Sequence, residues 1–386
     1  MRPVRTGLDV LLKDESDVTR GQKAGFVTNQ TAVTHDSIPA VDALLHAKVN
    51  IISLFTPEHG IRGEALNGEK VASSTDSRTG LPIHSLYGQT KKPTPEMLQD
   101  LDLLLFDIQD AGARFYTFLS TMACSMQACA ENRKPFILLD RPNPLGGTAV
   151  EGPMLDNRFS SFVGLYPIPI RYGMTIGELA LYINSEFGID ADLKVINMRE
   201  WKRNMWFDET GLAWIPPSPA MPTLDTAIVY PGTCLLEGTN LSEGRGTTSP
   251  FELAGAPWVD GPAFSEALNH AKLPGVYFDI SEFTPTHSKY AGEICSGVRV
   301  RVADRERFLP VLTGIEIIEL AHRLWPGEMS FREAGEDGRS FFDLLAGTDR
   351  IRLQILNGKT AEEIADGWSE EIQRFKINAA RYFLYE

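Results

Sequence analysis

Short apolar runs alternate with amphipathic stretches over the first 140 or so residues of the chain. The apolar runs cover 23–29, 50–55, 101–108 and 135–140. The stretches with helical spacing between them cover 37–48, 95–101 and 115–133. Continuous apolar strands separated by helices are typical of a parallel sheet that is covered on both faces. The pattern therefore predicts an α/β fold whose N-terminal domain, residues 1–165, has a Rossmann-like parallel sheet.

The pattern changes after about residue 165. An amphipathic helix is predicted over 175–188, with Thr175 as N-cap and Glu178 at the capping-box position. A strand is predicted over 192–198, and period-two alternation over 277–283 and 297–304 predicts half-buried antiparallel strands. Two long helical segments end the chain. We expect residues 166–386 to form a smaller α+β domain that completes a cleft.

Each predicted strand of the first domain ends in polar or charged residues. In parallel sheets, ligands bind beyond the carboxyl ends of the strands. Loops are polar in any case, which explains single strand ends. The general polarity of loops explains less well why four successive strand ends each offer a carboxylate or an amide. These ends are Asn29–Gln30, Glu58–His59, Asp107–Asp110 and Asp140–Asn143. The pattern favours a functional cleft at this edge.

The phosphate-binding loops of nucleotide enzymes are missing from the sequence. The first strand is followed by TNQTAVTHD, which contains no glycine. Neither GxGxxG nor GxxxxGK[ST] occurs. We therefore expect no dinucleotide or ATP, and no other cofactor.

The net charge of −14 over 386 residues argues against nucleic acid and against an anionic membrane surface as partners. No run of about 18 apolar residues occurs, so no membrane insertion is expected. The first residues lack the apolar region of a signal peptide, which predicts a cytoplasmic location for the chain as given and an exported one if a leader precedes it. The four cysteines and scattered histidines have no metal-site spacing, so no metal is expected. A small-molecule substrate is the expected partner.

One further stretch is rich in functional groups. The glycine-rich stretch 235–255 contains Glu237, Asn240, Glu243 and Arg245. The structural alternative is a solvated loop that contains a Glu–Arg pair. We favour a functional site, because a purely structural loop rarely packs two glutamates and an arginine among its glycines. Asp140 and Tyr116 are also candidate site residues, but each has an equally plausible structural role. Asp140 could form an ion pair that stabilises its turn, and Tyr116 could be an aromatic residue of the core.

Carboxylates remain as the candidates for chemistry, since no GxSxG motif or metal spacing occurs. Paired carboxylates hydrolyse glycosidic bonds, and one of them must be held protonated by an apolar setting. Glu58 fits the role of general acid, because it follows the apolar run 50–55 and Pro57.

Six motifs, in order, carry a resemblance to a known family: TPEHGIRG, SLYG, FDIQDAGARFYT, LDRPNPLGG…VEGP, RYGMTIGELA and YPGTCLLEGTNLSEGRGTTSPFE. The chain resembles bacterial exo-acting β-N-acetylmuramidases of peptidoglycan turnover, once known only as a domain of unknown function. The resemblance covers nearly the whole chain. It implies a Rossmann-like domain, a smaller C-terminal domain and release of terminal N-acetylmuramic acid, with Glu58 as catalytic acid. It also implies sugar contacts from motif residues, for which the candidates are His59, Arg62, Gln109, Arg114, Tyr116, Asp140, Arg171, Glu237, Asn240 and Arg245.

N-acetylmuramic acid carries a lactyl carboxylate, which an arginine would read by a bidentate contact. Arg62 and Arg245 are the candidates for this contact. The second catalytic group stays open, because Asp110 or Glu243 could orient the substrate's acetamido group, or a carboxylate could act as nucleophile. Two other functions compete with the glycosidase. An amidase or esterase would need a nucleophile–base pair or a metal, whereas a non-catalytic sugar- or muropeptide-binding protein would use the same cleft without chemistry.

Overall fold

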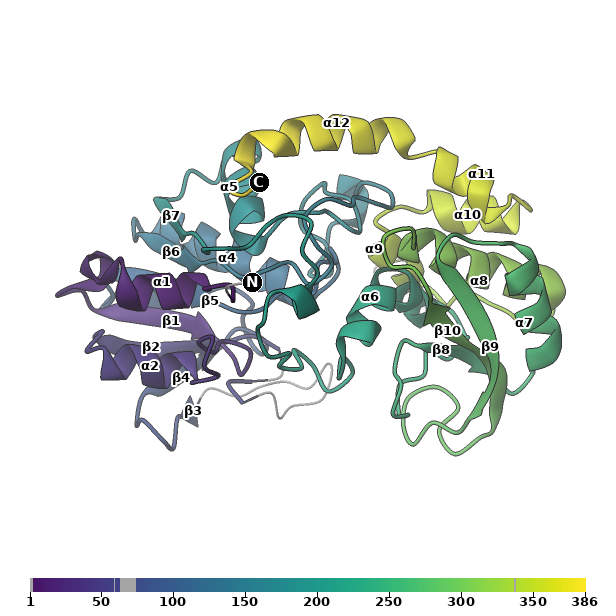
Figure 1. Ribbon diagram of the computed structural model, residues 1–386, viewed down its shortest axis with the longest axis horizontal. Coiled ribbons are helices and arrows are strands. Elements are labelled where there is room, and N and C mark those ends of the chain that lie inside the picture. The colour runs from purple at the N-terminus through teal and green to yellow at the C-terminus, as the bar shows by residue number, and fades with distance from the viewer. Residues whose placement is uncertain (1–2, 59, 63–73, 337) are drawn as a thin grey trace.

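A parallel sheet forms the first half of the molecule (Figure 1). The computed structural model describes residues 3–58, 60–62, 74–336 and 338–386. The strands of the larger sheet lie in the order β3-β4-β2-β1-β5-β6-β7, and all pair in parallel except β3. Their bounds are β1 Ala24–Thr28, β2 Ile51–Thr56, β3 Ser74–Thr75, β4 Pro82–Ser85, β5 Leu103–Asp107, β6 Phe136–Leu139 and β7 Leu193–Ile196.

The parallel strands, numbered along the chain, lie in the order 3-2-1-4-5-6, which is the order of a Rossmann fold. The predicted Rossmann-like sheet is therefore confirmed. The central strands β1, β5 and β6 are fully buried, as their continuous apolar sequence requires, whereas the strands towards the edges, β3, β4 and β7, contain exposed residues. β7 pairs with β6, so the sheet takes residues from both sides of the predicted division at 165/166.

Helices of the first half lie against this sheet or lead out of it. They are α1 Gly7–Lys13, α2 Ala40–His46, α3 Pro95–Leu98, α4 Thr117–Glu131 and α5 Ile176–Glu186. α5 begins with the predicted capping box, in which the Thr175 hydroxyl accepts from the Glu178 backbone N–H and the Glu178 carboxylate accepts from the Thr175 N–H. This reciprocal pairing satisfies two backbone donors and sets where the helix starts.

The second half is built on a small antiparallel sheet in the order β8-β10-β9. Its strands are β8 Leu253–Ala256, β9 Val276–Phe283 and β10 Cys295–Val302. β9 and β10 pair over their whole lengths, which confirms the predicted antiparallel strands. The helices of this half are α6 Leu224–Thr233, α7 Gly261–His270, α8 Pro310–Leu324, α9 Phe341–Ala346, α10 Arg350–Leu356, α11 Ala361–Asp366 and α12 Ser369–Ala379.

The end of the chain returns to the first half. α12 runs along the top of the molecule in Figure 1 and brings the C-terminus beside α5. Arg381 pairs with Glu186 at 2.6 Å, and the Tyr385 hydroxyl donates to Asp140 Oδ2 at 2.6 Å. The last residues thus tie the second half to the first sheet. Among the described residues, no helix is both long and apolar enough to cross a membrane.

Candidate active site

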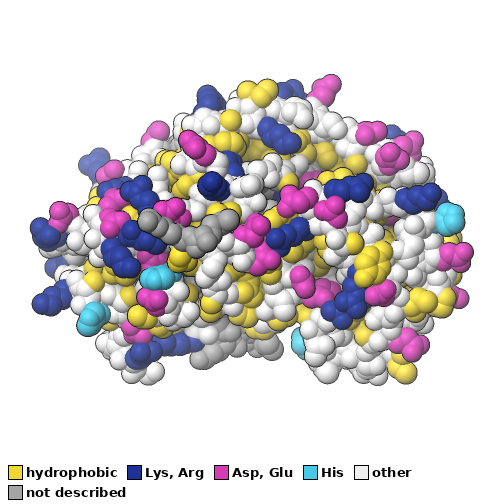
Figure 2. Space-filling view, in the orientation of Figure 1, with side chains coloured by type: hydrophobic (Ala, Val, Ile, Leu, Met, Phe, Trp, Pro, Cys, Tyr) yellow, Lys and Arg dark blue, Asp and Glu magenta, His cyan; other side chains and the backbone are white. Residues whose placement is uncertain are grey.

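A cavity of about 900 Å³ lies between the two halves of the molecule. Its first wall comes from the loops that follow β2, β4 and β5, and its second wall from α6, the glycine-rich stretch and loops of the second half. Figure 2 shows one face of the molecule, over which acidic and basic side chains are interspersed. The polar residues that line the cavity include Glu58, Tyr87, Tyr116, Thr117, Tyr230, Glu237, Asn240, Glu243, Arg245, Lys289 and Arg332.

Glu58 stands just beyond the carboxyl end of β2, on the first wall. The Thr117 hydroxyl, at the first residue of α4, donates to Glu58 Oε2 at 2.8 Å. Tyr87, just after β4, also hydrogen-bonds Glu58. Burial raises the pKa of Tyr87 well above its usual value, and the charge of Glu58 and this hydrogen bond raise it further. The carboxylate is thus oriented by one hydroxyl from the start of α4 and another from the loop after β4.

Aromatic rings line the cavity next to this carboxylate. Tyr116 meets Tyr230 edge to face at 5.8 Å between ring centroids, and Tyr230 meets Phe251 at 4.8 Å. The Tyr116 hydroxyl is buried and has no hydrogen-bond partner among the described residues. Burial, followed by the charge of Glu58, raises the pKa of Tyr116. Apolar rings with a few convergent polar groups are typical of a small-molecule site.

The second wall carries a network of opposite charges. Arg245 Nε lies 2.6 Å from Glu237 Oε1 and 3.6 Å from Glu243 Oε1. Lys289 Nζ lies 2.9 Å from Glu243 Oε2, and Glu243 is only 2% exposed. Burial alone would lower the pKa of Arg245, but the charges of Glu237 and Glu243 outweigh it and raise that pKa. Two cations and two carboxylates are thus paired along this wall of the cavity.

The glycines of this wall allow a close approach of two loops. Gly246 has a φ of +83°. A Cβ atom there would lie 2.5 Å from the backbone oxygen of His287. The Gly246 carbonyl accepts from the Thr286 N–H at 2.9 Å. A glycine at this position lets the loop that carries Lys289 pack against the loop that carries Arg245.

Five of the residues predicted from the motifs line the cavity together with Glu58: Tyr116, Glu237, Asn240, Glu243 and Arg245. Asn240 lines the cavity, but both ends of its side-chain amide are hydrogen-bonded to the backbone of the protein. Its Nδ2 donates to the Glu328 carbonyl at 2.7 Å and its Oδ1 accepts from the Ser330 N–H at 2.9 Å.

The structure does not bring Arg114 and Arg171 to this cavity. Arg114 is fully buried and donates to the carbonyls of Pro153, Ile168 and Leu345. Burial lowers its pKa to about 9. Arg171 donates to the Leu145 carbonyl at 2.7 Å, and burial lowers its pKa as well. Both guanidinium groups hold loops together, so we do not carry them forward as sugar contacts.

Three other predicted residues are also committed to the protein interior. Gln109 donates to the carbonyls of Asp110 and Pro142. Asp110 accepts from the Tyr172 hydroxyl and from the Gly112 N–H, and burial raises its pKa to about 7. Asp140 accepts from the Gly177 N–H near the start of α5. None of the three lines the cavity.

The two remaining candidates follow Glu58 in the chain. Arg62 pairs with Asp76 at 2.7 Å and borders a separate hollow of about 140 Å³. His59 lies outside the described residues.

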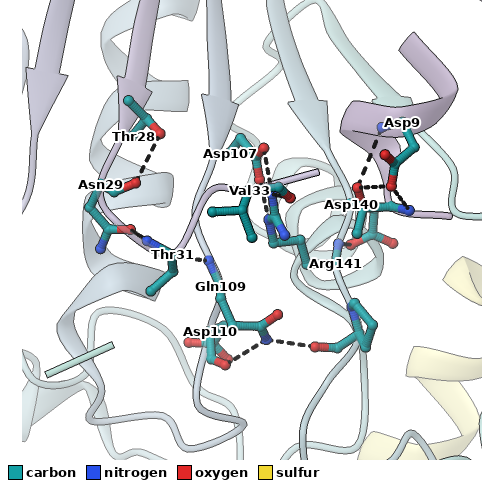
Figure 3. Close-up of polar contacts among 12 residues, drawn as sticks. Asp9, Thr28, Asn29, Thr31, Val33, Asp107, Gln109, Asp110, Asp140 and Arg141 are labelled. Carbon is teal, nitrogen blue, oxygen red and sulfur yellow. Dashed lines mark hydrogen bonds and ion pairs between the residues drawn. The ribbon is translucent and has the colours of Figure 1, made fainter. Parts of the chain in front are cut away.

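The crevice where a Rossmann fold binds a dinucleotide is filled by the protein's own side chains. This crevice lies where the strand order reverses, between β1 and β5. Figure 3 shows Arg141 pairing with Asp107 there, while Asn29 and Thr31 connect to the backbone of Gln109. The hollow beside Thr31, Gln109 and Arg141 has a volume of about 10 Å³. Among the described residues, no group of three or more potential ligands could hold a metal ion.

Sequence reasoning missed several residues of the cavity. Tyr87 belongs to the SLYG motif, where it follows a strand too short to predict. Lys289 and Arg332 lie in polar loops far from any quoted motif. Nothing in their local sequence indicates that tertiary packing brings them beside the glycine-rich stretch.

The comparisons with known proteins agree along the whole chain. Residues 24–225 match the family described as exo-beta-N-acetylmuramidase NamZ, N-terminal, and residues 228–385 match its C-terminal counterpart. The chain is 49% identical over 383 residues to the peptidoglycan beta-N-acetylmuramidase NamZ of Bacillus subtilis (strain 168). The matched region covers 99% of this chain and 91% of that protein. Two crystal structures of DUF1343 family proteins from Bacteroides fragilis NCTC 9343 are similar, with TM-scores of 0.93 and 0.81 and identities of 38% and 34%, each over 100% of this chain and 99% of the other.

Proposed function

Because this chain belongs to the NamZ family of exo-β-N-acetylmuramidases, it is a glycosidase, and we propose that Glu58 is the general acid with which it releases terminal N-acetylmuramic acid from peptidoglycan fragments. The observation that carries the proposal is the position of Glu58, on the wall of the cavity at the carboxyl end of β2. Thr117 and Tyr87 orient its carboxyl group.

In this mechanism the protonated Glu58 gives its proton to the glycosidic oxygen as the bond from that oxygen to C1 breaks. The aglycone leaves as a neutral alcohol, and Glu58 is left as a carboxylate. Hydroxyl donors from Thr117 and Tyr87 stabilise that carboxylate. Water then adds at C1, and Glu58 takes the proton from it.

The second carboxylate of the mechanism is Glu243 in this proposal. Asp110, the other candidate, does not line the cavity, and its carboxylate accepts from the Tyr172 hydroxyl and the Gly112 N–H. Glu243 lies on the second wall, where Lys289 and Arg245 stabilise its charge. A fixed carboxylate there can accept the N–H of the substrate's 2-acetamido group and orient its carbonyl oxygen towards C1. Glu237, held by Arg245, is a further sugar contact.

The test is incubation of the purified protein with a chromogenic β-N-acetylmuraminide and with a natural disaccharide that has N-acetylmuramic acid at its non-reducing end. We expect free N-acetylmuramic acid from both substrates. A protein that binds these sugars, as measured by calorimetry, but releases nothing would instead be a non-catalytic muropeptide-binding protein.

A further inference from the structure

Among the described residues, three basic side chains line the cavity, and they differ in how fully their N–H donors are already engaged by the protein. They are Arg245, Lys289 and Arg332. The substrate of the proposed function is an anion, because the lactyl ether of N-acetylmuramic acid ends in a carboxylate. A basic group that is already saturated by the protein contributes little to reading that carboxylate, so the contacts of each one decide which is available.

Lys289 is saturated. Its ammonium group has three N–H donors. They reach the Leu236 carbonyl at 2.8 Å, the Leu241 carbonyl at 2.7 Å and Glu243 Oε2 at 2.9 Å. Lys289 therefore holds the glycine-rich stretch and Glu243 in place.

Arg245 is engaged as well. Its Nε donates to Glu237 at 2.6 Å, Glu243 lies 3.6 Å from the same atom, and its guanidinium stacks over the Phe251 ring at 4.7 Å. A substrate carboxylate next to Arg245 would also meet the negative charges of Glu237 and Glu243. Like charges at this distance oppose binding.

Arg332 differs from both. No carboxylate of the described residues lies within 4.0 Å of its guanidinium, and its one hydrogen bond from the side chain, to the Glu237 carbonyl, is 3.5 Å long. The guanidinium stacks against the Phe341 ring at 5.5 Å, and Phe341 also lines the cavity. The side chain is exposed at the cavity wall.

The backbone around Arg332 is nevertheless held firmly. The Arg332 N–H donates to the Gly238 carbonyl at 2.9 Å, and the Asn240 N–H donates to the Ser330 carbonyl at 3.0 Å. Thr239 and Phe331 pair as an antiparallel bridge. These contacts fix the base of the Arg332 side chain against the glycine-rich stretch, which reduces the ordering that a ligand must impose.

We propose that Arg332 reads the lactyl carboxylate of the substrate, and thereby sets the preference for N-acetylmuramic acid over N-acetylglucosamine. This inference rests on the proposed function and replaces the two arginines suggested by the motifs. Arg62 is paired with Asp76 outside the cavity, and Arg245 with Glu237. A guanidinium can meet a carboxylate through two parallel hydrogen bonds, which a lysine ammonium cannot do.

The test compares three β-linked chromogenic substrates that differ only at the lactyl position: the muraminide, its lactyl carboxamide, and the glucosaminide. Arg332→Leu should lower kcat/KM on the muraminide tenfold to a hundredfold, mainly through KM. That loss corresponds to about 1.4–2.8 kcal/mol. The same variant should leave kcat/KM on the carboxamide and the glucosaminide within about twofold, because neither offers a negative charge. Arg332→Lys should recover part of the loss.

Arg374→Leu on the exposed face of α12 is the matched control and should change none of the three values. Equal losses on all three substrates with Arg332→Leu, or an unchanged preference for the muraminide, would overturn the inference. Failure of the proposed function is distinguishable, because the wild-type protein would then release nothing from the muraminide.

Discussion

The two hydroxyls that orient Glu58 come from different elements of the fold. Each one can therefore be removed by a single substitution while the other stays in place. Thr117 opens α4, and Tyr87 follows β4. A hydrogen bond to a charged group contributes about 1.5–3 kcal/mol. The hydrogen bonds from Thr117 and Tyr87 can therefore hold the Glu58 carboxyl group in one orientation.

Thr117→Val keeps the shape of the side chain and removes the donor to Glu58. We expect kcat on the muraminide to fall about tenfold with little change in KM, because the loss affects the orientation of the acid and not sugar binding. Thr117→Ser should restore most of the rate. Steady-state kinetics of the two variants check this, and equal activity of Thr117→Val and wild type would show that the hydroxyl has no positioning role.

Asp110 predicts a dependence of stability on pH. Burial raises its pKa from 3.8 to about 7 in the folded protein. Between these values the folded state keeps a proton that the unfolded state has released, so the stabilisation by this group is lost as the pH rises from about 4 to about 7. Asp110→Asn cannot ionise. The melting temperature of the wild type should therefore fall relative to that of Asp110→Asn over this range, and a constant difference would contradict the assignment.

At the residue scale, the sequence predicted Glu58 and the acidic groups of the glycine-rich stretch, which line the cavity, but it could not separate residues that face the cavity from residues that hold loops. Arg114 shows why. Its partners are the carbonyls of Pro153, Ile168 and Leu345, and the last lies 231 residues away. A charged residue in a motif has the same local pattern whether it meets a substrate or a distant carbonyl.

At the scale of elements, apolar runs predicted the strands that are buried on both faces, because such strands need continuous apolar sequence. β4 was missed, since it has four residues and begins with a proline. The final helical segment, predicted as one helix, is divided into α11 and α12, with Gly367 at the end of α11. Local pattern does not locate such a break in an amphipathic segment.

The crossing of α6 and α8 depends on two glycines. A Cβ at Gly232 would overlap the backbone of Pro310, and one at Gly314 would overlap the backbone of Gly232. Gly232→Ala should therefore destabilise the protein by about 1–3 kcal/mol, because the neighbouring atoms are backbone and cannot move aside cheaply. Gly327→Ala is the control, since open space surrounds that position. Chemical denaturation measures both, and equal stabilities would show that the helices can separate without cost.

At the scale of the whole molecule, the Rossmann-like parallel sheet was predicted from the alternation of strands and helices, whereas the cavity is formed by both halves together. The rule that ligands bind at strand carboxyl ends predicted a site at Glu58, and Glu58 lines the cavity. The same rule misplaced Gln109 and Asp140, because the crevice between β1 and β5 is filled by Arg141 and Asp107. The second wall depends on loops from residues 230 to 345, whose arrangement no local pattern indicates.

The central claim is that Glu58 protonates the leaving group, and the most direct measurement is kcat/KM of Glu58→Gln on muraminides with leaving groups of different basicity. Glutamine keeps the size and much of the hydrogen bonding of the side chain but cannot donate this proton. We expect a loss of roughly 10²–10⁴ with a sugar aglycone, and a much smaller loss with dinitrophenol, which leaves without protonation. Near-wild-type turnover of the sugar aglycone, or the same loss with every leaving group, would contradict the assignment.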